Sequence, residues 1–343
     1  MTSVIYLIDT RYGQRGWLHP SARHRCYHYA DVLDATDHQS LVIPLERVSA
    51  KLLGKFEHAI FHRPTNSKRF LRAFKLCRQN NVTMHADYDD LVFSADYAEQ
   101  SPLYLNGGRR LQRVEAQFQA NGQAAGMFDS FLTSTRFLQQ KINQHFSAAN
   151  VTVLPNALPR LFKRPIGQST VGSTKVIGYF PGSRGHEADF NSIYSALKDL
   201  LGKRLRLLIV GRWNHSNTEA LPGVVHLPFS DYNQYLKLLS QVDISVAPLQ
   251  NNVFNNSKSA VKLIESVSVG TPIVATAIPD MQDHHNALAV LVKSNNDWKA
   301  SIVDALHTAE DRGMIQQESR LLANRYSVSN RLRVLQEHLG CAA

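Results

Sequence analysis

Short runs of apolar residues alternate with longer stretches of mixed polarity through most of the chain. The apolar runs are rich in Val, Ile and Leu, which is typical of strands buried in a parallel sheet. The stretches between them have the length and the polar–apolar spacing of helices. Strands and helices in alternation predict an α/β fold in which helices cover parallel sheets.

The pattern occurs twice. We expect strands at residues 4–8, 41–45, 58–62, 82–86, 128–133 and 151–154, and again at 175–180, 205–210, 224–227, 244–247 and 272–276. We expect helices at residues 187–202, 231–241, 258–269 and 327–339. Residues 163–174 are rich in Pro, Gly, Ser and Thr and have no periodicity, so they are predicted to be a linker.

Two doubly wound, Rossmann-like domains that face each other across a cleft explain this order of elements most simply. We expect the first domain to span residues 1–165 and the second to span residues 175–325. Residues 326–343 are expected to form a final helix that crosses back to the first domain. The length of 343 residues also suits two domains better than one.

The composition, 43% hydrophobic and 19% charged residues, is that of a soluble globular protein. No apolar run is long enough to span a membrane, and the opening residues lack the features of a signal peptide. The three cysteines have no metal-type spacing. We therefore expect a cytoplasmic protein.

The net charge of +10 is concentrated in the first half of the chain. Residues 1–170 contain 21 Lys and Arg against 13 Asp and Glu, whereas residues 171–343 contain 17 against 15. A basic first half indicates an anionic partner: nucleic acid, a phosphorylated substrate or the anionic face of a membrane.

The most informative segment is 247–276, where a buried strand leads through an Asn-rich loop into a predicted helix. Ser257 is the expected N-cap, and Gly270 ends the helix. Lys258, Lys262 and Glu265 are spaced to share one helix face. A helix amino terminus binds diphosphates, lysines add charge, and a carboxylate can accept hydrogen bonds from ribose hydroxyls. The alternative is a solvated helix face with a Lys–Glu pair.

This succession of strand, Asn-rich loop, K-S-x-x-K-x-x-E helix and G-T-P-I-V-A-T resembles the donor site of retaining GT-B glycosyltransferases of the family-4 type. Members of that family usually have two glutamates eight residues apart in this segment. Glu265 matches the second, which holds the nucleotide ribose, and the resemblance adds Asn256 to the donor site. Ser257 replaces the first, which normally lies by the donor sugar, so the sugar is not identified.

A second segment, 176–186, resembles the phosphate-contacting loop of the same family. Gly182 permits close backbone approach, Arg184 can bind phosphate oxygens, and His186 is a candidate to orient the phosphate or the sugar. The alternative is a plain turn with an exposed arginine. Gly211 ends a strand that, in the family, lies beside the nucleotide base.

The resemblance also places several residues of the first domain at the cleft. They are Gly13, Arg15, Arg23 and Arg25. The alternative is a structural turn with surface arginines. Three nearby carboxylates, Asp87, Asp89 and Asp90, have the spacing of a possible metal site. This fold generally stabilises the diphosphate with protein cations, so we favour a solvated acidic turn near the acceptor and expect no metal.

The resemblance implies transfer of a hexosyl group from a nucleotide diphosphate-sugar to a glycan or lipid-linked acceptor, with retention of configuration. The expected setting is bacterial surface polysaccharide assembly, such as lipopolysaccharide biosynthesis. The donor is a co-substrate, and no cofactor is expected. Arg184, Lys258 and Lys262 are the expected cations that stabilise the leaving diphosphate.

Three other functions are compatible with parts of the sequence. A sugar-nucleotide epimerase of the same fold would bind the same donor. A catalytically idle binding protein is motivated by Ser257. Nucleic-acid binding is suggested by charge alone, but the chain has no recognised motif for it, and we expect no nucleic-acid partner.

Residues 67–79 predict a basic amphipathic helix. Lys68, Arg69, Arg72 and Lys75 lie beside an apolar stripe of Phe70, Leu71, Phe74 and Cys77. Such a helix can lie on an anionic membrane, here the inner face of the cell membrane. The alternative is that the stripe packs on its own sheet. We expect at most a peripheral, salt-sensitive association.

Overall fold

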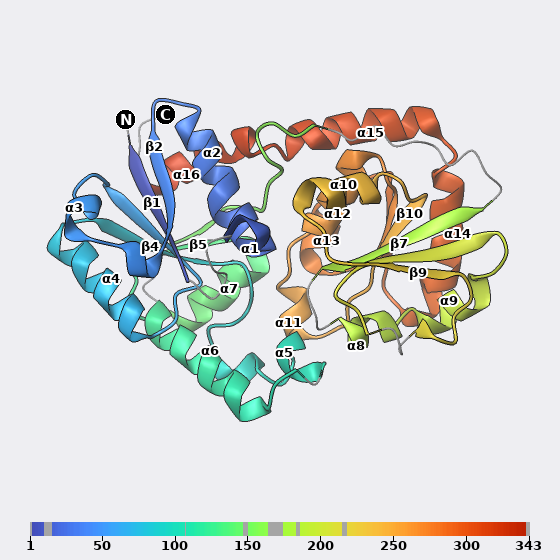
Figure 1. Cartoon of the computed structure of the whole chain (residues 1–343), viewed down its shortest axis with the longest axis horizontal. Helices are drawn as coiled ribbons and strands as arrows, with labels where there is room; N and C mark the ends of the chain where they lie inside the picture. The colour runs from blue at the N-terminus through green and yellow to red at the C-terminus, as the bar shows by residue number, and fades with distance from the viewer. Residues whose placement is uncertain are drawn as a thin grey trace.

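The computed structural model describes residues 2–9, 16–106, 108–146, 150–163, 174–182, 186–214 and 218–340. Most of the predicted linker, together with Gly13, Arg15 and Arg184, lies outside these residues. Two parallel sheets of six strands lie side by side, each with helices on its faces (Figure 1).

The first sheet has the order β2-β1-β3-β4-β5-β6. Its strands are β1 (Ser3–Ile8), β2 (Gln39–Pro44), β3 (His58–His62), β4 (Thr83–Tyr88), β5 (Ser130–Thr133) and β6 (Asn150–Val153). Its helices are α1 (Pro20–Ala22), α2 (His28–Asp34), α3 (Ala50–Leu53), α4 (Lys68–Gln79), α5 (Pro102–Leu105), α6 (Leu111–Ala125) and α7 (Arg136–His145). All six strands were expected from the apolar runs.

The second sheet has the order β12-β11-β10-β7-β8-β9. Its strands are β7 (Lys175–Gly182), β8 (Leu205–Gly211), β9 (Val224–Leu227), β10 (Ile244–Ala247), β11 (Ile273–Thr276) and β12 (Ala289–Val292). Its helices are α8 (Glu187–Asn191), α9 (Tyr194–Leu200), α10 (Tyr232–Leu239), α11 (Val253–Asn256), α12 (Val261–Val269), α13 (Pro279–Asp283), α14 (Trp298–Thr308) and α15 (Arg312–Arg325). The edge strand β12 was not predicted.

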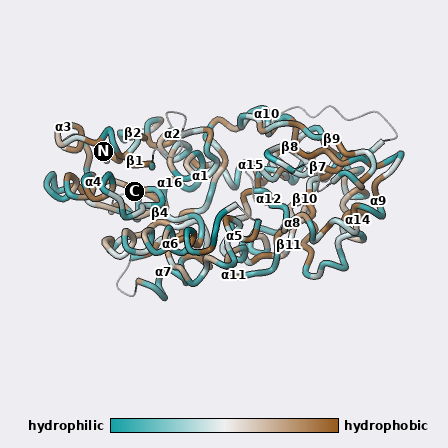
Figure 2. Tube along the Cα trace, turned by 60° about the horizontal axis from the view of Figure 1, so that its bottom comes forward, coloured by the Kyte–Doolittle hydropathy of each residue, from teal (hydrophilic) through white to brown (hydrophobic). Residues whose placement is uncertain are grey.

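The first sheet is buried on both faces, as a doubly wound fold requires. Successive residues of β1 point to opposite sides: Ile5 and Leu7 join the core under α4 and α6, whereas Val4 and Tyr6 join the core under α2. Apolar and polar residues alternate along the trace of α4, which has one buried face (Figure 2). The continuous apolar runs of the sequence follow from this two-sided burial.

Two helix predictions were wrong in their bounds. The segment 187–202 forms two short helices, α8 and α9, instead of one. The segment 258–269 starts as an extended turn, and α12 begins only at Val261. It ends at Gly270 as expected, with a φ of 86° that favours glycine.

The last helix, α16 (Leu332–His338), returns to the first domain after α15 has run along the second (Figure 1). The predicted stripe packs there: Leu335 and Leu339 are buried in the core under α2, and Leu332 lies against it. At its end a cluster of three histidines joins α16 to β3 and β4. His338 Nε2 lies 3.0 Å from His85 Nδ1, and His85 Nε2 lies 3.1 Å from His58 Nδ1.

Acid should loosen this histidine cluster. Burial, and then the neighbouring imidazoles, lower the pKa of His85 to about 3 and that of His338 to about 4. Between pH 6.5 and 4 the unfolded chain therefore binds protons that the folded cluster does not, so stability falls as pH falls. We expect His338→Gln to flatten the dependence of the urea-unfolding free energy on pH in this window. An unchanged slope would contradict the prediction.

Candidate active site

The site forms where the carboxyl ends of both sheets meet. Glu265, in the second turn of α12, is buried, with 2% of its surface exposed. Its Oε2 accepts a hydrogen bond from the Tyr235 hydroxyl at 2.8 Å, and its Oε1 lies 3.2 Å from Nε2 of His24 in the first domain. Glu265 thus links the two domains.

The environment of Glu265 keeps the carboxylate ionised. Burial raises its pKa, but the hydrogen bond from His24 and the charges of Lys262, His24 and Arg23 outweigh burial and lower that pKa to about 2. The Nδ1 of His24 also lies 3.2 Å from the carbonyl oxygen of Ala157. Both ring nitrogens of His24 thus face oxygen atoms, one on each domain.

Lys262 lies one turn before Glu265 on the same helix face. Its ammonium group lies 4.6 Å from the centre of the Tyr235 ring and 3.4 Å from the Tyr235 hydroxyl. Burial lowers the pKa of Lys262, although the charge of Glu265 opposes this shift. The expected pairing of these two residues on one face is therefore present, but α10 packs against that face, where Glu265 is buried and Lys262 is half-buried.

Arg23 approaches the same place from the first domain. It opens η3 (Arg23–Tyr27), a π-helical turn between α1 and α2, and such turns are rare and frequent at functional sites. Its guanidinium lies 4.0 Å from the centre of the Tyr232 ring at the start of α10. Its Nε is buried without a hydrogen-bond partner among the described residues.

Two predictions about the start of the donor helix were wrong. Ser257 is not the N-cap of α12: it follows α11, is fully buried, and donates a hydrogen bond to the carbonyl oxygen of Phe254 at 2.6 Å. Lys258 precedes the helix and lies 5.5 Å from the Phe254 ring, so it does not share the face of Lys262. The actual cap residue is Ala260.

The amino terminus of α12 is also partly occupied. The backbone N–H of Ala260 is one of the groups that would bind the diphosphate at a helix amino terminus. It already donates a hydrogen bond to Oδ2 of Asp280 at 2.6 Å. Burial raises the pKa of Asp280 to about 7, against the opposing effect of this hydrogen bond. A diphosphate at this terminus would therefore compete with Asp280.

Arg25 and Asp87 do not face the cleft, contrary to expectation. Both are buried beneath it, and Arg25 Nε donates to the two carboxylate oxygens of Asp87 at 3.0 and 3.2 Å. Arg25 also donates to the carbonyl oxygen of Leu154. His62 Nδ1 lies 2.9 Å from Asp87 Oδ2. This cluster fastens η3 to the sheet and to the junction with the second domain.

Protein groups pair with the acidic turn, in which Asp89 is buried and Asp90 is half-buried. Arg63 forms ion pairs with Asp89 at 2.5 Å and with Asp90 at 2.6 Å, and Ser21 donates to Asp89 at 2.6 Å. Among the residues that the structure describes, no group of three His, Cys, Asp or Glu side chains is arranged to hold a metal ion.

The remaining donor-site candidates lie on the second domain. Gly182 and Gly211 are paired neighbours at the carboxyl ends of β7 and β8, and Gly211 has a φ of 145°. His186 lies at the start of α8, and Asn256 is the half-buried last residue of α11. Hydrogen bonds between the domains flank this region: Asn156 donates to Ser259 at 2.8 Å.

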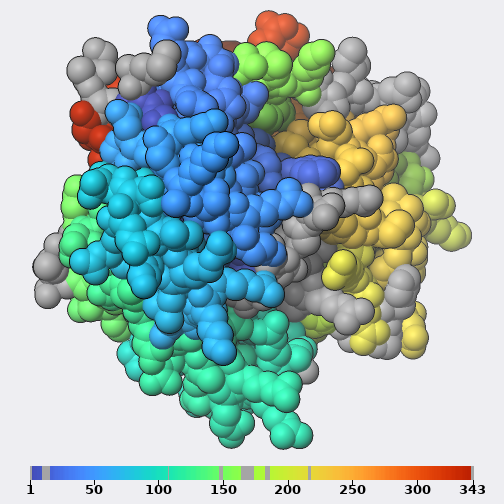
Figure 3. All heavy atoms as spheres, turned by 60° about the vertical axis from the view of Figure 1, so that its left-hand side comes forward, coloured from blue at the N-terminus to red at the C-terminus, as the bar shows by residue number. Residues whose placement is uncertain are grey.

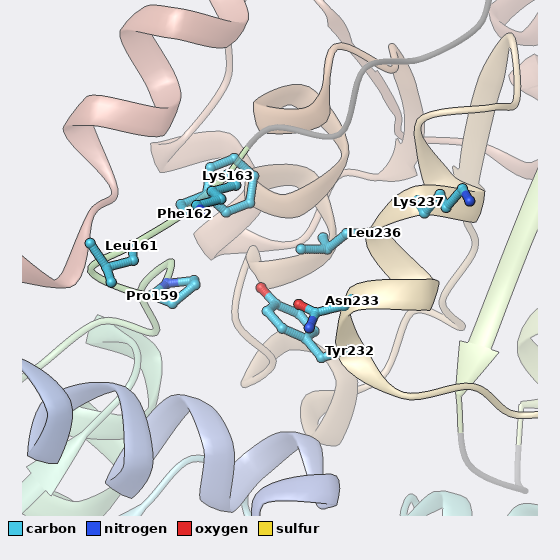
Figure 4. A pocket seen from close by; sticks show the side chains of 8 residues that line it. All are labelled: Pro159, Leu161, Phe162, Lys163, Tyr232, Asn233, Leu236 and Lys237. Atoms are coloured by element: carbon cyan, nitrogen blue, oxygen red, sulfur yellow. The ribbon is translucent and has the colours of Figure 1, made fainter.

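A pocket of about 510 Å³ opens beside this junction (Figure 4). Pro159, Leu161 and Phe162 of the interdomain connection line one side, and α10 lines the other. Tyr232 belongs both to this pocket and to the stacked pair with Arg23. Tyr232 therefore lies between the pocket at the interdomain connection and the site around Arg23.

The sequence reasoning missed His24, Tyr232 and Tyr235. His24 stands between two arginines that were chosen, and the two tyrosines are spaced i, i+3 at the start of a predicted helix. These were the available signals. These signals could not show that His24 contacts Glu265, because more than 200 residues separate the two in the sequence.

The whole-chain fold matches that of known two-domain transferases. Sucrose-phosphate synthase from Thermosynechococcus elongatus is 12% identical, with a TM-score of 0.67 over 98% of each chain. HepE from Anabaena, in complex with UDP and glucose, is 12% identical, with a TM-score of 0.65 over 100% of each chain. A glycosyltransferase from Rickettsia africae is 11% identical, with a TM-score of 0.64 over 99% of each chain. The fold is GT-B, as expected.

The sequence of the second domain matches a family model. Residues 175–309 match the model of the family described as glycosyl transferases group 1. This segment includes β7 to α14, and with them Lys262, Glu265 and His186. This part of the second domain is therefore similar to glycosyl transferases group 1. No curated protein sequence matches the chain.

Proposed function

We propose that the protein transfers a hexosyl group from a nucleotide diphosphate-sugar to a glycan or lipid-linked acceptor, with retention of configuration and without a metal. The observation that carries this proposal is the placement of Lys262 and Glu265, within the matched family segment, opposite Arg23 and His24 of the other domain. An ionised carboxylate and a cation from each domain, Lys262 and Arg23, thus lie close together.

Each of these groups has a separate task. Glu265 accepts hydrogen bonds from the ribose hydroxyls of the donor. When the donor binds, these hydrogen bonds replace the contact between Glu265 and His24. Lys262 and Arg23 stabilise the charge that grows on the diphosphate as the bond to the sugar breaks. Arg184 and Lys258 are two further cations that we propose to contact the phosphates. The acceptor attacks from the face that the diphosphate leaves, and a phosphate oxygen takes the acceptor's proton.

A bacterial surface polysaccharide, such as a lipopolysaccharide, is the proposed product. HepE, a protein of the same fold, is described in complexes with UDP and UDP-glucose. A uridine diphosphate-sugar is therefore the first donor to test.

Nucleotide binding and product analysis test this function together. In a thermal-shift screen of UDP, GDP, dTDP and CMP, the correct nucleotide at 100 times its Kd should add about 2.7 kcal/mol of stability. Transfer should then persist in excess EDTA and yield a glycoside with the anomeric configuration of the donor. Loss of activity on chelation, restored by Mg²⁺, would contradict the metal-free reaction.

Two other outcomes would replace the proposed reaction. An epimerised donor without a glycoside would identify an epimerase. Nucleotide binding without any turnover would identify a binding protein. The buried Ser257 favours this alternative, because its hydroxyl donates to the carbonyl oxygen of Phe254.

We further propose that the first domain associates peripherally with anionic membranes on the cytoplasmic side. None of the described helices is long and apolar enough to cross a membrane. In α4 the apolar residues Phe70, Phe74 and Cys77 are buried on the domain's own sheet, so only Leu71 of the stripe is exposed. The attraction must therefore come from charge. Side chains of this segment, in light blue, lie on the outer surface of the first domain (Figure 3).

Vesicle flotation tests the membrane proposal. The exposed Lys68, Arg72 and Lys75 should each add about 1 kcal/mol of attraction near an anionic surface. We expect flotation with anionic vesicles at low salt, none with neutral vesicles, and loss of flotation when these three residues are replaced by Gln. Equal flotation with both kinds of vesicle would contradict it.

A further inference from the structure

Asp189, in α8, is a buried carboxylate that connects two loops of the donor domain. Only 3% of its surface is exposed. Its Oδ1 accepts hydrogen bonds from the backbone N–H of Gln250 at 2.8 Å and from Asn255 Nδ2 at 3.1 Å. Its Oδ2 lies 3.0 Å from His186 Nδ1. One carboxylate thus contacts both His186, at the start of α8, and the Asn-rich loop that leads to α12.

The contact with Asp189 determines which nitrogen of the His186 ring is free to contact a ligand. Since a carboxylate only accepts hydrogen bonds, Nδ1 must donate, and Nε2 is the atom left for a ligand. Among the described residues Nε2 has no hydrogen-bond partner, and 21% of the side chain is exposed. Two residues later, the N–H of Ala188 donates to Asn106 of the first domain at 2.9 Å. The ring is therefore held at the boundary between the domains.

We propose that Asp189 is a positioning residue and that it directs His186 Nε2 to the diphosphate of the donor. This inference rests on the proposed function. A diphosphate at Nε2 would put an anion at each nitrogen, and an imidazole between two anions holds a proton on both. The bond from the anomeric carbon to the diphosphate oxygen breaks with its electron pair staying on oxygen. Nε2–H then donates a hydrogen bond to the charged diphosphate, and the acceptor's proton still goes to a phosphate oxygen.

Asp189 serves a second purpose through the Asn-rich loop. Asn255 Nδ2 also donates to the carbonyl oxygen of Gln250 at 2.9 Å, and Asn255 Oδ1 is buried without a partner among the described residues. The loop is therefore held by donors that converge on one carboxylate. An Asn at position 189 has one oxygen fewer and cannot accept from all three donors.

A double-mutant cycle tests the coupling between the two residues. We expect His186→Ala and Asp189→Asn each to lower kcat by about 100-fold, the cost of removing one charge-stabilising donor. Because both changes remove the same interaction, the double variant should lie within about threefold of the weaker single variant. Asp199→Asn, an exposed carboxylate on α9 that pairs with Lys299, is the matched control and should keep wild-type kcat. Circular dichroism checks the fold of each variant.

The outcomes separate this inference from the proposed function. If the wild type transfers sugar and Lys262→Ala lowers kcat, but either test variant keeps wild-type kcat, the proposed positioning of His186 by Asp189 is wrong and the proposed function stands. Losses that multiply to about 10⁴-fold would also overturn the coupling. An inactive wild type would overturn both proposals.

A second comparison applies if Asp189→Asn does not fold. His186→Gln keeps an N–H near the position of Nε2, so it should retain at least tenfold more turnover than His186→Ala. Equal losses in the two variants would exclude a hydrogen bond from Nε2. A product of inverted configuration would overturn the diphosphate contact and assign Nε2 to the acceptor hydroxyl.

Discussion

Replacing Arg25 with Met is expected to destabilise the protein by about 3–5 kcal/mol, because it leaves Asp87 as a buried charge without its main partner. Although burial alone would raise the pKa of Asp87, the charge and hydrogen bonds of Arg25 and a hydrogen bond from His62 keep that pKa below its usual value. Without Arg25, Asp87 must either remain charged in a buried position or take up a proton, and both outcomes cost stability. Urea unfolding followed by circular dichroism measures the loss.

Two companion variants show whether the buried charge is the cause. Arg25→Met combined with Asp87→Asn removes both charges and should recover part of the stability. Arg333→Met removes an exposed arginine that pairs with Glu337 on α16, and should cost less than about 0.5 kcal/mol. If the double variant is no more stable than Arg25→Met, the loss comes from packing and not from the unpaired Asp87.

The second large effect is kinetic and concerns the face shared by Lys262 and Glu265. Lys262→Ala should lower kcat by an amount equivalent to about 2–4 kcal/mol, because the diphosphate charge grows during transfer. Glu265 contacts ribose before and during transfer, so Glu265→Gln should raise KM for the donor at least as much as it lowers kcat. Steady-state kinetics on both variants separates the two roles.

Lys299→Ala is the control for the lysine variant, since Lys299 is exposed on α14 and pairs with Asp199. It should leave both kinetic constants unchanged. Lys258→Ala should cost less than Lys262→Ala, because Lys258 lies outside the helix, against Phe254. Wild-type turnover and donor affinity in the Lys262 and Glu265 variants would show that the donor site lies elsewhere.

Much of the fold could be predicted from apolar runs, because the inner strands of a doubly wound sheet are buried on both faces. The strand β12 escaped this reasoning: it is short, lies at the edge, and has half-buried residues at Val290 and Leu291. The start of α12 escaped it for another reason. Asn252, not Ser257, accepts the capping hydrogen bond, from Asn255, so a separate turn, α11, forms first.

The site was harder to predict than the fold, because its contacts join residues far apart in the sequence. Glu265 and Lys262 were identified by spacing within one helix. Asp87 was expected in a solvated turn, since the sequence gives no sign that Arg25, 62 residues earlier, would pair with it. The same limit concealed His24, whose importance depends on how the second domain is placed.

Because α16 packs on the first domain, the core of that domain cannot be completed until the end of the chain has been synthesised. Leu154 and Leu335 are buried in the same core, yet about 180 residues separate them along the chain. At 5–20 residues per second, a ribosome needs roughly 10–40 s to make the intervening segment. The apolar surface beside α2 stays uncovered during that interval, and a chaperone that binds exposed apolar surface would meet the nascent chain there.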